Sequence, residues 1–141
     1  MVAPFSRTFV IEGRNFLNAG KASTAIKGML KELGVSPGII RRVAIAAYEA
    51  EMNVVMYAKR ATMAFSMTPS LIQIQVEDEG PGIPDIAAAM QEGFSTATRE
   101  MREMGFGAGM GLPNIRKNAD DFTIESTVGK GTLLTIRINI S

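Results

Sequence analysis

Two glycine-rich segments constrain this chain more than any other feature. The first, residues 78–83, ends an apolar strand with a carboxylate and continues into a tight turn, Asp-Glu-Gly-Pro-Gly-Ile. The second, residues 105–112, has glycine at every other position just before a predicted helix. Glycine allows backbone conformations and close approaches that other residues forbid. Together the segments predict a site where a carboxylate binds a base and a flexible backbone covers phosphates, with ATP as the leading ligand.

Composition limits the possible classes of protein. At 141 residues, we expect one domain spanning 1–141 that is long enough to bury a core. The net charge of +1 gives no electrostatic case for nucleic acid or an anionic membrane surface as a partner. No apolar run reaches spanning length and the start lacks the pattern of a signal peptide, so we expect a cytoplasmic protein. The absence of cysteine and histidine excludes disulfides, thiolate or histidine metal sites, and histidine-based catalysis within this chain.

Hydrophobic periodicity predicts a strand, two helices, a hairpin, a short helix, a long loop, another helix and a second hairpin. Gly34 is a plausible cap of the first helix, and Ser36-Pro37 is a start signal for the second. This order favours an α/β sandwich with helices on one face of the sheet. The predicted helices are 16–33, 37–60, 86–91 and 112–119, and the predicted strands are 8–11, 61–65, 71–77, 122–126 and 132–140.

Glu49 and Asn53 are four residues apart in the second predicted helix and therefore share one face. Among apolar neighbours, a carboxylate and an amide are costly unless something pairs with them. Asn53 offers an oxygen that Mg²⁺ accepts in a shell completed by phosphates and water, and Glu49 could orient or deprotonate a hydroxyl near the terminal phosphate. Glu51 points about 160° away from Glu49, so we expect it at the surface. The alternative is an ordinary polar notch at the helix edge.

Asp78 shares a strand face with the aliphatic residues before it, so its carboxylate is aimed at the core side and must find a donor. The amino group of adenine is such a donor, and Gly80 and Gly82 would let the backbone approach the base. Thr132, at the start of the last strand, could join Asp78 around the base, directly or through water. The alternatives are an aspartate that caps its own turn and a threonine that simply favours a strand.

The alternating glycines lie in a segment, 93–111, that is long for a loop in a compact domain. Their N–H groups could line a phosphate, and the helix from Leu112 would add its N-terminal dipole. Neither the dinucleotide fingerprint nor the Walker loop matches this spacing. Arg99 and Arg102 could reach the γ-phosphate when the loop closes. A flexible linker with solvated arginines is the alternative.

Four elements in this order and spacing resemble the N, G1, G2 and terminal Gly-Thr motifs of the GHKL ATPase superfamily, which includes gyrase-type ATPases, Hsp90, MutL and histidine kinases. The elements are Glu49-x-x-x-Asn53, Asp78-x-Gly80-x-Gly82, residues 105–112 and Gly131-Thr132. Within the superfamily, a stand-alone domain of this length resembles the anti-sigma-factor serine/threonine kinases of bacteria. The stretch 92–107 looks most like the RsbT-type switch kinases of the stressosome. Tyr57 departs from the pattern, because many relatives carry histidine there.

The resemblance implies a Bergerat fold, a two-layer α/β sandwich with a mixed, mostly antiparallel sheet. It implies Mg²⁺ held through Asn53, adenine recognised by Asp78, Glu49 as the catalytic base and a lid formed by 93–111. The implied substrates are serine or threonine hydroxyls on STAS-domain proteins, and such kinases are also thought to activate a partner phosphatase. The remaining expected ATP contacts are Gly80, Gly82, Ile83, Arg99, Arg102, Gly105, Gly107, Ala108, Gly109, Met110, Gly111, Leu112 and Thr132.

The leading hypothesis is an ATP-dependent protein serine/threonine kinase that also switches partners. A second hypothesis is an anti-sigma protein that sequesters a sigma factor and uses its kinase activity for release. A third is a nucleotide-gated module without transfer activity, against which the presence of Glu49 argues. The first two share every ATP motif, so the partner protein distinguishes them.

Overall fold

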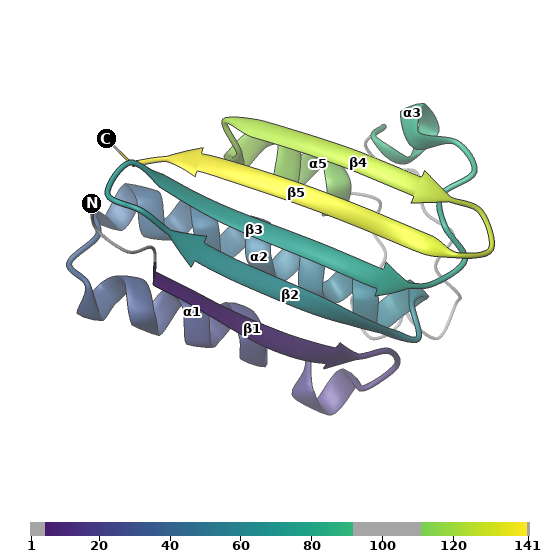
Figure 1. The fold of residues 1–141 in the computed structure, drawn as a ribbon, viewed down its shortest axis with the longest axis horizontal. Helices are drawn as coiled ribbons and strands as arrows, with labels where there is room; N and C mark the ends of the chain where they lie inside the picture. Colours follow the sequence, from purple (N-terminus) through teal and green to yellow (C-terminus); the bar gives the residue numbers. More distant parts are fainter. Residues whose placement is uncertain (1–4, 92–110, 141) are drawn as a thin grey trace.

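Five strands form one sheet in the order β1-β2-β3-β5-β4, and each neighbouring pair is antiparallel. The computed structural model describes residues 5–91 and 111–140. Figure 1 shows α1, α2 and α5 on the same side of the sheet, which confirms the two-layer α/β sandwich. The strands are β1 Phe5–Glu12, β2 Arg60–Met67, β3 Leu71–Glu79, β4 Asp121–Thr127 and β5 Gly131–Asn139. The helices are the 3₁₀ turn η1 Phe16–Asn18, then α1 Lys21–Glu32, α2 Pro37–Tyr57, α3 Ile86–Ala89 and α5 Gly111–Asn118.

The helix predicted at 16–33 is split, and its second part ends as expected. Gly20 has φ of +93° at the N-cap of α1, so the chain turns between η1 and α1 instead of continuing as one helix. At the other end, Gly34 has φ of +75° and donates its N–H to the Lys31 carbonyl, while Val35 donates to the Leu30 carbonyl. These two bonds form a Schellman cap, which confirms the role predicted for Gly34.

The second helix is shorter than predicted. It ends at Tyr57 because Ala58 takes an extended conformation, and the Lys59 N–H donates to the Glu79 carbonyl at 2.8 Å, next to the start of β2. None of the helices in 5–91 and 111–140 is long and apolar enough to cross a membrane.

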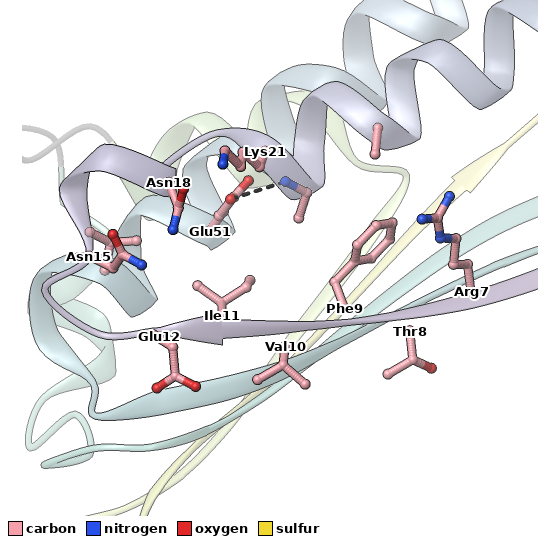
Figure 2. Close-up of a pocket in the computed structure, with 13 residues that line it drawn as sticks. Arg7, Thr8, Phe9, Val10, Ile11, Glu12, Asn15, Asn18, Lys21 and Glu51 are labelled. Carbon is pink, nitrogen blue, oxygen red and sulfur yellow. Dashed lines mark hydrogen bonds between the residues drawn. The ribbon is translucent and has the colours of Figure 1, made fainter.

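Glu51 is buried, so its predicted place at the surface was wrong. Its side of α2 is covered by α1, and the residue is only 2% exposed. The carboxylate accepts hydrogen bonds from three backbone N–H groups at the start of α1, those of Gly20 at 3.0 Å, Ala22 at 3.2 Å and Ser23 at 2.9 Å. Figure 2 draws one of these bonds at Glu51. The first N–H groups of a helix have no partner within the helix, and its N-terminus favours an anion. Glu51 thus caps α1 from a different helix.

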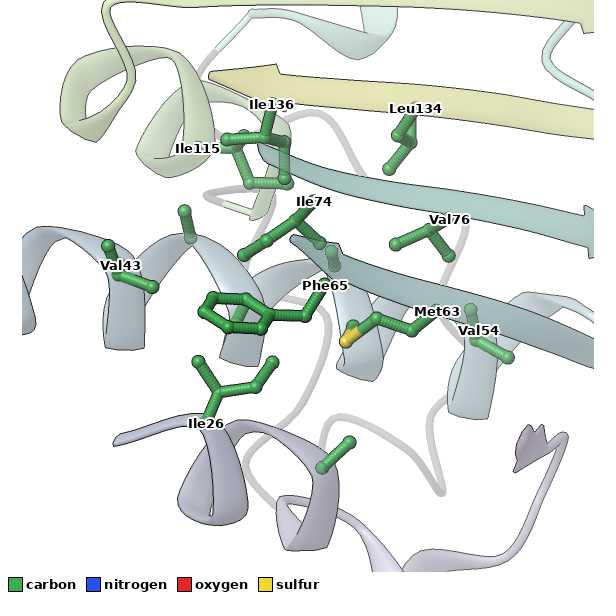
Figure 3. Close-up of a cluster of buried hydrophobic side chains, with 14 of the residues drawn as sticks. Ile26, Val43, Val54, Met63, Phe65, Ile74, Val76, Ile115, Leu134 and Ile136 are labelled. Carbon is green, nitrogen blue, oxygen red and sulfur yellow. The ribbon is translucent and has the colours of Figure 1, made fainter. Parts of the chain in front are cut away.

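The core lies between the helix layer and the covered face of the sheet. Alternate residues of each strand point toward the helices, as the period of two requires. Figure 3 shows side chains of β2, β3 and β5 meeting side chains of α1, α2 and α5. The labelled members of this cluster are Ile26, Val43, Val54, Met63, Phe65, Ile74, Val76, Ile115, Leu134 and Ile136. This packing fixes α2 against the sheet and therefore fixes the direction of every polar side chain on α2.

We predict that Glu51→Ala lowers the free energy of unfolding by about 2–4 kcal/mol, because three buried or half-buried N–H groups lose their acceptor. Urea denaturation at pH 7 measures the change. Glu77→Ala removes an exposed carboxylate from the uncovered face of the sheet and should change stability by less than about 0.5 kcal/mol. A loss for Glu51→Ala no larger than that of this control would contradict the capping role.

Candidate functional site

Glu49 and Asn53 lie half-buried on the face of α2 that meets the first residue of α5. A Cβ atom at Gly111 would lie 3.3 Å from Glu49 Oε2 and 3.7 Å from Asn53 Oδ1. Glycine at this position therefore lets the start of α5 approach Glu49 closely, because a Cβ there would be closer to Glu49 than ordinary van der Waals contact allows. Within 5–91 and 111–140, no hydrogen bond joins either side chain to another residue.

Burial raises the pKa of the Glu49 carboxyl above its ordinary value of 4.5, because desolvation disfavours the charged form. No cation or hydrogen-bond donor among the described residues offsets this effect. A carboxylate that holds its proton more tightly is a stronger general base. The arrangement thus places a proton acceptor on α2, next to the start of α5.

Asp78 lies near the end of β3, on the covered face opposite Ala61 of β2. Its Oδ1 atom accepts a hydrogen bond from the Thr132 N–H at 3.1 Å. Burial raises the pKa of the Asp78 carboxyl, and the Thr132 hydrogen bond lowers it by a smaller amount. In the described residues this is the carboxylate's one hydrogen bond, so Oδ2 has no donor among them. The period-two pattern placed Asp78 on the correct face.

A chain of polar contacts ties Asp78 to the glycine turn that follows it. Thr132, which is 7% exposed, has its hydroxyl 2.9 Å from the Ser126 hydroxyl. The Ser126 Oγ atom also accepts a hydrogen bond from the Ile83 N–H at 2.7 Å. Ser126 was not among the residues predicted for the site. The available signal was its position directly across the β4–β5 hairpin from Thr132.

The two glycines after Asp78 bring chain segments together. A Cβ atom at Gly80 would lie 3.0 Å from Asp78 Oδ1 and 3.2 Å from Ala58, at the end of α2. Gly82 has φ of +75°, and a Cβ there would lie 2.9 Å from Val128 of the β4–β5 hairpin. Among the described residues, the close approaches that these glycines allow are to the protein's own backbone and side chains. Contact of Gly80, Gly82 or Ile83 with a ligand stays a prediction.

The helix α2 links the two halves of the site. Glu49 and Asn53 face Gly111, while Ala58, five residues after Asn53, contacts the turn beside Asp78. The C-terminal part of α2 therefore runs from the start of α5 to the turn that follows Asp78.

Several predicted contacts lie outside the described residues. These are Arg99, Arg102, Gly105, Gly107, Ala108, Gly109 and Met110, together with residues 93–110 of the lid predicted at 93–111. Leu112 is described, and its side chain is 7% exposed and packed in the core. Only the backbone of Leu112 can therefore contact a ligand.

The family model of the histidine kinase-like ATPase domain matches residues 18–138. The chain belongs to this family. The membership predicted from the four ordered motifs is thus confirmed, and it implies that the domain binds ATP.

Relatives in this family include kinases and sigma-factor regulators. The serine/threonine-protein kinase RsbT of Bacillus subtilis is 33% identical over 110 residues, which cover 75% of this chain and 77% of that protein. An anti-sigma F factor of Caldanaerobacter subterraneus subsp. tengcongensis is 33% identical over 122 residues, covering 83% and 82%. A chain of the SiaB–SiaC complex from Pseudomonas aeruginosa has the same fold, with a TM-score of 0.58 at 12% identity over 95% of this chain and 89% of that one.

We predict that Glu49→Gln stabilises the protein at neutral pH and has little effect below pH 4.5. A carboxyl whose pKa is raised on folding stabilises the fold while protonated, and this contribution is lost as pH rises through the folded pKa. Glutamine avoids the loss, so the gain should appear on going from acid to neutral pH and stay below about 1 kcal/mol, because solvent screens a half-buried group.

Thermal unfolding of both proteins across pH 4–8 measures this difference. Glu125→Gln, at an exposed position in β4, is the matched control and should change stability by less than about 0.5 kcal/mol. Equal stability of Glu49→Gln and the original protein at pH 7 would show that the Glu49 carboxylate has a partner.

Proposed function

We propose that this protein is an ATP-dependent protein serine/threonine kinase that regulates a bacterial signalling pathway by switching partners. The observation that carries the proposal is the half-buried Glu49, which has no hydrogen-bond partner among the described residues and lies with Asn53 on the face of α2 next to Gly111. The 33% identity to a serine/threonine-protein kinase over most of both chains supports it.

Asp78 would hold the base of ATP. Its Oδ1 atom is fixed by the Thr132 N–H, which orients Oδ2 to accept a hydrogen bond from the adenine amino group. The Thr132 hydroxyl, which lies 2.9 Å from the Ser126 hydroxyl, would position the base or a bridging water. Because these groups are already joined to each other, little ordering remains to be done when nucleotide binds.

Asn53 would hold Mg²⁺. The described residues contain no cluster of three or more acidic, histidine or cysteine side chains that could hold a metal. A single amide oxygen fits an ion whose other ligands are phosphates and water, which is the usual pattern for Mg²⁺ with nucleotides. Bound there, Mg²⁺ would neutralise charge on the phosphates during transfer.

Glu49 would act as the base. The hydroxyl oxygen of a serine or threonine attacks the γ-phosphorus, the bond from that phosphorus to the bridging oxygen breaks, and ADP leaves. The hydroxyl proton passes to Glu49, whose pKa is raised by burial and whose carboxylate has no competing partner in the described residues. Backbone N–H groups of 105–111, Arg99 and Arg102 are proposed to contact the phosphates.

The proposed substrates are hydroxyls on STAS-domain proteins in the cytoplasm, and a serine phosphatase is a proposed second partner. The similarity to an anti-sigma F factor supports a different candidate, in which the protein sequesters a sigma factor and phosphorylation controls its release. A pull-down with candidate STAS proteins and sigma factors as separate baits would distinguish the two.

Two variants test the proposed site separately. Asp78→Asn should weaken binding of Mg²⁺ and ATP by about 10–100-fold, because a hydrogen bond to a charged acceptor is lost, and calorimetry measures it. Asp121→Asn, at an exposed position in β4, is the control. Unaltered nucleotide affinity in Asp78→Asn would remove this residue from the site.

Glu49→Ala should bind nucleotide nearly as well as the original protein but transfer phosphate about 10²–10⁴-fold more slowly. Transfer is measured with labelled ATP, Mg²⁺ and candidate STAS-domain proteins. Full activity in this variant would exclude Glu49 as the base, and loss of nucleotide binding would give it a binding role instead.

A further inference from the structure

Ser126 joins the end of the β4–β5 hairpin to the turn that follows Asp78. Its Oγ atom has three polar neighbours, which are the Ile83 N–H at 2.7 Å, the Thr132 hydroxyl at 2.9 Å and the Gly131 carbonyl at 3.2 Å. A serine hydroxyl has one proton to donate and two lone pairs that accept. Three contacts therefore use all of its hydrogen-bonding capacity within the protein itself.

The chemistry of these neighbours fixes the direction of each hydrogen bond. The Ile83 N–H can only donate, and the Gly131 carbonyl can only accept. The single proton of Ser126 must go to the Gly131 carbonyl, because otherwise two acceptor oxygens would face each other at 3.2 Å. The hydrogen bond between the two hydroxyls then runs from Thr132 to Ser126. The Thr132 hydroxyl has no proton left for a ligand and can only accept.

Thr132 and Asp78 are joined at the proposed base-binding end of the site. The Thr132 N–H donates to Asp78 Oδ1 at 3.1 Å, and a Cβ atom at Gly131 would lie 3.3 Å from the same oxygen. An ionised carboxylate only accepts hydrogen bonds. Both side chains therefore offer acceptors alone, the aspartate by its nature and the threonine because Ser126 takes its proton.

We propose that Ser126 determines base specificity, because taking the Thr132 proton makes the site prefer a 6-amino purine to a 6-oxo purine. This role rests on the proposed function, since it requires a nucleotide at Asp78. The 6-amino group of adenine has two protons to donate, one for Asp78 and one for Thr132 or a water bound to it. A 6-oxo purine places an acceptor there instead, and acceptors that face one another without a proton are costly. Ser126 acts through Thr132 and is thus a positioning residue.

ATP and inosine triphosphate are the probes. They differ in having an amino or an oxo group at position 6 and in the proton that only inosine carries at N1. In calorimetry of the full chain with Mg²⁺, ATP should bind more tightly than inosine triphosphate. Equal binding of the two nucleotides by the unaltered protein would overturn the proposal.

Ser126→Ala frees the Thr132 hydroxyl to turn and donate its proton to the 6-oxo group. The preference for ATP, measured as the ratio of the two dissociation constants, should fall at least about three-fold. A purely structural role of Ser126 would weaken both nucleotides alike and leave this ratio unchanged, which would overturn the proposal. Thr123→Ala removes an exposed hydroxyl from the same strand and is the matched control, with no change of the ratio expected.

Thr132→Val tests the route by which Ser126 acts. It removes the accepting hydroxyl but keeps the shape of the side chain, so the preference for ATP should fall here too. In this background, Ser126→Ala should have no further effect on the ratio, because the hydroxyl that it would release is gone. An unchanged ratio in Thr132→Val, or an undiminished effect of Ser126→Ala in the double variant, would overturn the proposal.

These measurements separate failure of the proposed specificity from failure of the proposed function. If neither nucleotide binds, the proposed function fails and the role of Ser126 fails with it. If ATP binds but neither variant changes the ratio, only the role of Ser126 is excluded. Loss of phosphate transfer with nucleotide binding intact would count against the kinase activity and leave every one of these ratios unaffected.

Discussion

The enclosure of α2 on three sides is the constraint from which the rest of the structure follows. One side packs on the sheet, a second on α1 and a third on the start of α5. Burial of a polar side chain on such a helix is costly unless the side chain finds a hydrogen-bond partner. Glu51 meets three N–H groups of α1, whereas Glu49 lies next to Gly111 without a hydrogen-bond partner among the described residues. Two glutamates two residues apart thus have opposite environments within the described residues, one with its charge satisfied and the other without a partner.

The proposed base-binding end of the site depends on a different feature, a hairpin packed against a turn. Asp78 and the turn after it belong to one part of the sequence, and Ser126 and Thr132 to another. Backbone and hydroxyl hydrogen bonds connect them, so the carboxylate has a fixed direction without any ligand. Preorganisation of this kind reduces the entropy lost on binding. It also explains why a glycine is needed at 82, where the hairpin backbone comes too close for a side chain.

Sequence patterns predicted what depends on local periodicity and missed what depends on distant partners. The alternation of apolar residues along β3 placed Asp78 on the covered face, and helical spacing placed Glu49 and Asn53 on one face of α2. Helical spacing also put Glu51 opposite Glu49, but it could not show that α1 covers that side. A clue existed, because the helix after Gly20 has no acidic residue in its first turn and its N-cap provides no side-chain hydrogen bond. A helix start without its own cap requires an acceptor from elsewhere.

The position of Glu51 has a consequence for partner exchange at the proposed nucleotide site. Glu51 holds the start of α1, and Asn53, two residues later, lies on the opposite side of α2, next to Gly111. Coupling between a partner and nucleotide requires that one ligand alter a state the other binds differently. The element common to both sides is α2, so any coupling between α1 and the proposed site must act through the position of this helix.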